Sequence, residues 1–161
     1  MTYRTKALDE LTMVNYLVDT LSSMSVDLDR KFGTGAKVIL KEASESMGAH
    51  VLGLYTSAWK VDKWTPELLG RAIVDLKAKL GGRAELVNAT NEKVVLKATM
   101  CEFGDDWIRE SGGLACVICA GVAGAMVKAS GLSSTNEVPV WETSIADGSP
   151  NCTVVAKLRA N

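Results

Sequence analysis

The hydrophobic periodicity of this sequence changes at the glycine pair Gly81-Gly82. Before that pair, apolar residues recur every three or four positions, which is the period of an amphipathic helix. After it, short runs rich in β-branched residues flank turn sequences, which is the pattern of strands joined in hairpins. Helices that precede a group of strands predict the α+β class, with a twisted antiparallel sheet and helices packed on it.

Two helices are expected in the first third of the chain. The first is predicted over about residues 7–24, with an apolar stripe of Leu8, Leu11, Val14, Leu17, Val18 and Leu21. The second is predicted after Gly33 and Gly35, and its apolar face consists of Ala36, Ile39, Leu40, Ala43 and Met47. The stretch from His50 to Trp59 is more apolar, and it either extends this helix or begins a strand.

A third helix and a hairpin are expected on either side of the glycine pair. The helix begins at Thr65, whose side chain can accept a hydrogen bond from a free backbone N–H, and Pro66 suits the first helical position. Gly81-Gly82 ends it, because glycine readily adopts the left-handed conformation. Residues 83–89 and 93–100 are then predicted as two strands joined by a turn at 90–92.

The last third is predicted to contain further helices and a second hairpin. A short polar helix is expected around Trp107, and an apolar segment from Leu114 to Val127 follows it. A membrane-spanning helix needs about 20 residues, so this shorter segment is predicted to be a helix buried inside the protein. Two strands, at about 137–145 and 151–158, flank a turn at 147–150.

Composition and charge limit the classes of function. Residues 1–161 fit one domain, and 47% of them are hydrophobic, which is enough to form a core. The net charge of −1, from 18 basic and 19 acidic residues, gives no electrostatic attraction to nucleic acid or to an anionic membrane. The N-terminal residues carry acids early, so no secretory signal is predicted. A cytoplasmic protein is therefore expected, in which thiols stay reduced.

Four cysteines in the second half are the first candidates for chemistry: Cys101, Cys116, Cys119 and Cys152. Cys116 and Cys119 share a helix face because they are three positions apart, and the other two lie beside predicted turns. Four thiolates suit a closed tetrahedral Zn²⁺ site or an iron–sulfur cluster. Two alternatives stay open. The cysteines pack in the core as small hydrophobic residues, or a thiol near the helix N-terminus acts as a redox switch.

An apolar ligand pocket is the second candidate site. Ligand sites are concave and mostly apolar, and the residues expected to line this one are Met100, Phe103, Trp107, Gly121, Met126 and Trp141. Each of these residues is also typical of an ordinary core. Glycines and alanines around Gly121 make one helix face small, which allows close approach to the sheet, to a second subunit or to a flat ligand. His50, the single histidine, is expected to be structural.

Three short motifs follow one another in the second half. The first is MCEFG at 100–104, the second is ACVICAGVAG at 115–124, and the third is GSPNC at 148–152. They are similar to a C-P-F-G turn, a C-x4-G-x2-G helix and a G-D-P-x-C strand opening. In this order and spacing, over residues 83–158, they resemble the V4R (4-vinyl reductase) family, also described as hydrocarbon-binding proteins.

This resemblance implies an α+β domain whose sheet and helices enclose a small-molecule pocket, and it implies a homodimer. Relatives include sensor domains for aromatic compounds that bind zinc near the pocket, and proteins tied to bacteriochlorophyll synthesis. In the sensor pattern, the zinc ligands are a cysteine at the helix start, a glutamate and two further cysteines. Cys116 and Cys152 match two of these positions, whereas Trp141 and Ser144 occupy the others. Cys101 and Cys119 would have to complete the site.

The resulting hypothesis is a V4R-like domain, without a fused output domain, that binds a small hydrophobic or aromatic ligand and a cysteine-bound zinc. It would act as a sensor, carrier or accessory factor. The alternatives are an enzyme, a cysteine-based redox or iron–sulfur sensor, and a pure interaction module like the vesicle-tethering relatives of this fold. A vinyl reductase needs a nucleotide or flavin loop, which the sequence lacks. A hydrolase similar to the aminothiazoline-carboxylate hydrolases would rely on a cysteine with Glu142.

Overall fold

The structure is a computed structural model, and it describes residues 13–110, 114–133 and 139–158. The helices are α1 (Met13–Phe32), α2 (Thr34–Trp59), α3 (Pro66–Lys79), α4 (Asp105–Glu110) and α5 (Leu114–Ala129). The strands are β1 (Arg83–Ala89), β2 (Lys93–Met100), β3 (Val140–Thr143) and β4 (Cys152–Lys157), with a 3-10 turn, η2 (Ile145–Asp147), before β4. The predicted change from helices to strands at Gly81-Gly82 is confirmed. Among the described residues, no helix combines the length and apolarity needed to cross a membrane.

The strands form an antiparallel sheet in the order β1-β2-β4-β3. Each predicted hairpin is present, and the two hairpins meet where β2 pairs with β4. The predicted bounds of the first two strands are confirmed. The third strand is shorter than predicted: residues 137 and 138 lie outside the described residues, and Ile145 already belongs to η2. The turn begins early because the Ser144 side chain accepts a hydrogen bond from the Ala146 N–H at 3.1 Å and caps η2.

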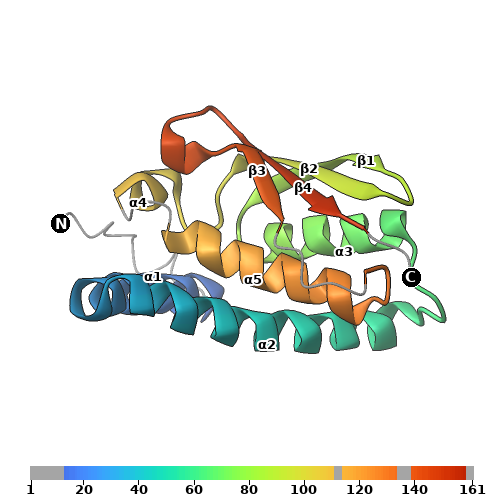
Figure 1. Cartoon of the computed structure of the whole chain (residues 1–161), viewed down its shortest axis with the longest axis horizontal. Coiled ribbons are helices and arrows are strands. Elements are labelled where there is room, and N and C mark those ends of the chain that lie inside the picture. The colour runs from blue at the N-terminus through green and yellow to red at the C-terminus, as the bar shows by residue number, and fades with distance from the viewer. Residues whose placement is uncertain (1–12, 111–113, 134–138, 159–161) are drawn as a thin grey trace.

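The helices lie on one face of the sheet in two layers (Figure 1). α3 and α5 pack on the sheet, while α1 and α2 pack on the far side of α5. The alternation of β2 explains why one face is covered, since Val94, Leu96 and Ala98 are buried and Lys93 is exposed. The predicted α+β architecture is therefore confirmed.

α2 runs unbroken to Trp59, so the stretch from residue 50 extends the helix and does not begin a strand. Its predicted buried face was wrong in part. Ile39, Ala43 and Met47 are exposed, and the buried residues of the helix are Ala36, Ser44, Gly48, Leu52 and Tyr55. The reason is the neighbour: α2 crosses the small-residue face of α5, and small side chains let the two helices approach.

The contact between α2 and α5 depends on glycines from both helices. A Cβ atom at Gly48 would meet the backbone carbonyl oxygen of Val122 and lie 2.9 Å from the Cβ of Ala125. A Cβ atom at Gly121 would meet the hydroxyl of Ser44 and lie 2.9 Å from the carbonyl oxygen of Lys41. The small face around Gly121 therefore packs against α2. The sequence pattern had not decided whether this face would pack against the sheet, a second subunit or a ligand.

α1 continues to Phe32, past its predicted end, and residues 7–12 lie outside the described residues. Its buried side carries Val18, Ser22 and Ser25, whereas its exposed side carries Leu17, Leu21 and Met24. The two buried serines donate hydrogen bonds to carbonyl oxygens one turn earlier, at 2.8 and 2.7 Å. The predicted core positions Leu17 and Leu21 thus face outward in the single chain.

Apolar side chains form two buried clusters. The main core lies between the sheet, α2, α3 and α5, and its fully buried members include Leu69, Val94 and Met126. The second cluster consists of Ala98, Cys101, Ile108, Ala115, Ile145, Cys152 and Val154. Phe103 packs against both, so the segment that follows β2 lies where the two clusters meet.

Candidate functional site

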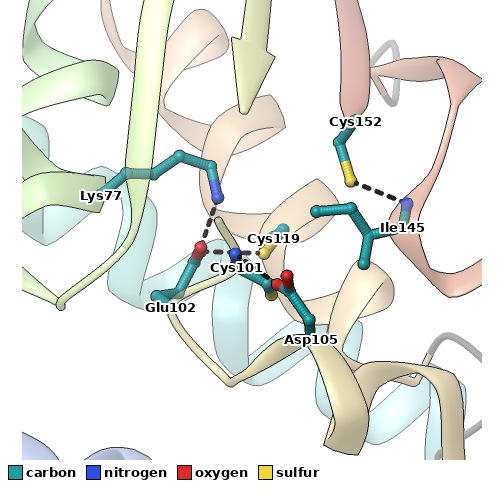
Figure 2. Close-up of polar contacts among 7 residues, drawn as sticks. All are labelled: Lys77, Cys101, Glu102, Asp105, Cys119, Ile145 and Cys152. Carbon is teal, nitrogen blue, oxygen red and sulfur yellow. Dashed lines mark hydrogen bonds and ion pairs between the residues drawn. The ribbon is translucent and has the colours of Figure 1, made fainter. Parts of the chain in front are cut away.

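The segment from Cys101 to Gly104 joins β2 to α4 through a tight turn. Gly104 has a φ of 87°, in the region that favours glycine, and its N–H donates to the carbonyl oxygen of Cys101 at 3.0 Å. The N–H of Cys101 donates to the carboxylate of Asp105 at 3.0 Å. These bonds fix the turn, in which Cys101 and Glu102 lie close to Lys77 and Cys119 (Figure 2).

Glu102 forms a buried ion pair with Lys77 of α3 (Figure 2). The Nζ atom lies 2.5 Å from Oε2, and the two side chains are 16% and 5% exposed for Lys77 and Glu102. The thiol of Cys119, on α5, donates to Oε1 at 3.2 Å. Each carboxylate oxygen therefore accepts a hydrogen bond from a different helix. Lys77, Cys101, Glu102 and Cys119 are called the polar cluster below.

The charge states of the polar cluster follow from burial and from the ion pair. Burial alone would raise the pKa of Glu102, but the Lys77 ammonium outweighs it and holds that pKa below its ordinary value. Burial alone would lower the pKa of Lys77, but the Cys119 thiolate, which forms only at high pH, and the Glu102 carboxylate outweigh it and raise that pKa. Burial, reinforced by the Glu102 carboxylate, raises the pKa of Cys101 to about 12 and that of Cys119 well above its ordinary range. The cluster is thus one ammonium, one carboxylate and two neutral thiols.

The other two predicted cysteines approach the segment that follows β3. Cys152 accepts a hydrogen bond from the N–H of Ile145 at 3.2 Å (Figure 2), and the sulfur of Cys116 lies 3.8 Å from the hydroxyl oxygen of Ser144. Burial raises the pKa of Cys116, although the Ser144 hydroxyl opposes this. Cys152 interacts electrostatically with both Cys101 and Cys116. The fold therefore brings the four cysteines into one region.

Proximity alone does not make a metal site. In the part of the chain that the structure describes, no group of three or more cysteine, histidine, aspartate or glutamate side chains could hold a metal ion. The Lys77 ammonium also lies among these thiols, and it opposes a second cation. The arrangement of these donors does not fit a zinc ion. Binding of zinc or of an iron–sulfur cluster therefore remains a prediction, and a measurement of the metal content tests it.

The polar cluster also lacks an activated nucleophile. A catalytic cysteine reacts as the thiolate, and the raised pKa values keep Cys101, Cys116 and Cys119 protonated near neutral pH. Glu142, the acid that a hydrolase would need, is exposed on β3. What the cluster offers instead is a neutral ion pair with hydrogen-bond donors around it.

The six predicted pocket residues lie in different parts of the fold. Phe103 and Trp107 pack together with ring centroids 5.7 Å apart, and both border the second cluster together with Trp141. Met126 is fully buried in the main core, Gly121 contacts α2, and Met100 is exposed at the end of β2. The three aromatic residues, Phe103, Trp107 and Trp141, pack against the same cluster as Cys101. The pocket itself stays a prediction.

Lys77 is the residue of this site that the sequence analysis missed. It lies beside the apolar stripe of α3, where a lysine is ordinarily solvated, and it is 25 positions from Glu102. Glu102 was noted only as a letter of the first motif. A signal did exist, because a charged residue between Cys101 and Phe103 interrupts an otherwise apolar turn.

Comparisons with known proteins agree with this fold. No family model matches the sequence, and a search of curated proteins finds no relative. One solved structure with this fold is the phenol-responsive sensory domain of the transcription activator PoxR with phenol. It is 15% identical over 88% of this chain and 74% of that chain, with a TM-score of 0.69. At this identity the likeness shows the shared fold alone.

A second similar structure is a trafficking protein particle complex subunit 3 from Naegleria fowleri, covalently bound to palmitic acid. It is 11% identical over 91% of this chain and 95% of that chain, with a TM-score of 0.62. The V4R resemblance of the motifs is consistent with the first of these neighbours.

The state of the thiols can be measured directly. Cys101 and Cys119 are expected to react slowly with a disulfide reagent such as DTNB in the native protein near neutral pH, because Cys101 is buried, Cys119 is partly buried, and burial raises both pKa values. After unfolding they should react at the rate of ordinary thiols. Zinc content is measured on the same sample, purified without chelators, and on a Cys119→Ser variant. Rapid labelling of the native metal-free protein would contradict this arrangement, whereas stoichiometric zinc that the variant loses would support the metal prediction.

Proposed function

We propose that this chain binds a small molecule that is mostly apolar or aromatic, and that it acts as a sensor, carrier or accessory factor. The observation that carries this proposal is the shared fold, because one neighbour holds phenol and the other holds palmitic acid. Both ligands have an apolar body and one polar head. In this chain, Phe103, Trp107 and Trp141 supply aromatic surface beside a buried polar cluster. Ligand sites combine these features, with many apolar residues and few polar groups.

Ligand binding is tested by calorimetry and by thermal shift with phenol, ethylbenzene and palmitate. Binding of at least one compound with saturable heat is expected, and it should raise the melting temperature because the ligand binds the folded state. A Trp107→Leu variant should bind more weakly. Val87→Ala is the control, since Val87 is exposed on β1, outside both the aromatic group around Trp107 and the helices α1 and α2. Absence of binding for all three compounds, or equal weakening by both variants, would count against the proposal.

We also propose that the chain works as a homodimer through the outer faces of α1 and α2. Large apolar side chains are exposed there: Leu17, Leu21, Met24 and Phe32 on α1, and Val38, Ile39, Met47, Leu54 and Trp59 on α2. Exposed apolar side chains that share one helix face mark an interaction site, and Leu17, Leu21 and Met24 share a face of α1 because they are spaced four and three positions apart. The evidence for an interface is strongest on α1, because this helix buries Ser22 and Ser25 and exposes Leu17 and Leu21.

Light scattering tests the homodimer. The parent is expected at twice the monomer mass of 17.2 kDa, and a Leu21→Lys/Met24→Lys variant is expected at the monomer mass with unchanged secondary structure. Val87→Lys is the control, because Val87 is exposed on β1, far in sequence from both helices. A parent that stays monomeric at micromolar concentration would refute this part of the proposal.

A further inference from the structure

The Lys77–Glu102 ion pair is buried where two apolar clusters meet, a position in which two charges cost free energy of desolvation. Moving two charges out of water costs several kcal/mol per ion, and well-packed hydrophobic residues are often equally stable or more stable. Lys77 and Glu102 nevertheless lie next to Phe103, which packs against both clusters. A pair in this place calls for a role beyond stability.

The pattern of donors and acceptors limits what the pair can bind. Both carboxylate oxygens of Glu102 already accept a hydrogen bond, one from Lys77 and one from Cys119. An ammonium group carries three hydrogens, and among the described residues the Lys77 ammonium has Glu102 as its hydrogen-bond partner. The Lys77 side chain also keeps 16% of its surface accessible, against 5% for Glu102. The Lys77 side chain is therefore more accessible to an incoming group than the side chain of Glu102, although each Glu102 oxygen keeps a lone pair.

The charge balance limits the ligand further. One ammonium and one carboxylate sum to zero. A ligand carboxylate or ammonium would bring an uncompensated charge into a buried region, which is costly. A hydroxyl group also needs an acceptor for its proton, and the remaining lone pairs of Glu102 lie on a side chain that is only 5% exposed. A carbonyl oxygen is neutral and only accepts hydrogen bonds, so it matches both limits.

We propose that Lys77, positioned by Glu102 and Cys119, donates a hydrogen bond to the carbonyl oxygen of the ligand. The preferred ligand class is accordingly a mostly apolar molecule with one neutral carbonyl group, such as an aryl ketone. This inference rests on the proposed function, and it names the ligand class of the same site.

The test compares four one-ring compounds of similar size: acetophenone, ethylbenzene, 1-phenylethanol and benzoate. Calorimetry on the full chain should show acetophenone binding about tenfold or more tightly than ethylbenzene, as expected for a hydrogen bond to a charged donor. 1-Phenylethanol should fall between them, and benzoate should bind more weakly than acetophenone. The carbonyl stretch of bound acetophenone should shift to lower frequency.

The matched variant is Lys77→Met/Glu102→Leu, which removes both charges together and leaves no unpaired charge. It should bind acetophenone and ethylbenzene with similar affinity, and the carbonyl shift should be absent. Equal binding of the first two compounds by the parent, or a preference that survives in the variant, overturns the inference while the proposed function stands. Failure of every compound to bind overturns both. If the double variant does not fold, the carbonyl shift in the parent decides the question.

Discussion

Replacing Gly48 by alanine is expected to destabilise the protein by about 3 kcal/mol or more, because it overpacks a contact made by backbone. The new methyl group would meet the carbonyl oxygen of Val122 and would lie 2.9 Å from both the Cα of Val122 and the Cβ of Ala125. A flexible side chain could move aside, but the backbone of α5 cannot move without disturbing the main core on its other side. Urea unfolding followed by circular dichroism measures the loss.

Gly53 provides the control in the same helix. A Cβ atom there would meet nothing within 4 Å, so Gly53→Ala should stabilise the protein by about 0.5–1 kcal/mol through helix propensity alone. Opposite signs for the two Gly→Ala changes are the expected result. Equal unfolding midpoints would show that α2 and α5 do not pack as closely as described.

Removing one partner of the Lys77–Glu102 pair is the second change with a large expected effect. Lys77→Met leaves the Glu102 carboxylate buried without the ammonium that neutralises it. Glu102→Leu leaves the Lys77 ammonium buried without a carboxylate. Breaking a buried pair in this way costs about 3–5 kcal/mol. The double variant should recover most of that loss, since neither charge remains. A double-mutant cycle with all three variants, measured by urea unfolding, gives the coupling energy.

Arg71→Met is the matched control on α3. Arg71 forms an ion pair with Glu67 at 2.6 Å, but the two side chains are 65% and 61% exposed. Exposed pairs contribute about 0.2–1 kcal/mol, so this variant should unfold close to the parent. If Lys77→Met and Arg71→Met have similar effects, the pair at Lys77 is solvated and the polar cluster is not buried.

Local patterns in the sequence determined the secondary structure of the second half. The strands at 83–89 and 93–100 were predicted with the correct bounds because short runs rich in β-branched residues flank a turn, and both signals act over a few positions. The start of α3 was also predicted, and the Thr65 side chain accepts a hydrogen bond from the N–H of Leu68 at 3.2 Å. The four cysteines lie in one region, as strand ends and a helix start meet at one end of such a sheet, but their role as a shared metal site stays a prediction.

The tertiary structure alone decided which helix faces are buried and which groups share the site. The sequence pattern predicts Ile39 and Met47 as core residues, yet α2 buries Ser44 and Gly48 instead. The reason is that α2 packs closely against α5, and only small residues fit in that contact. Lys77 and Glu102 are separated by the whole first hairpin, and no periodicity can pair them. Their partnership depends on how α3 lies under the sheet. Burial, in turn, sets the charge states of the thiols, so the chemistry of the site follows from packing that the sequence pattern does not contain.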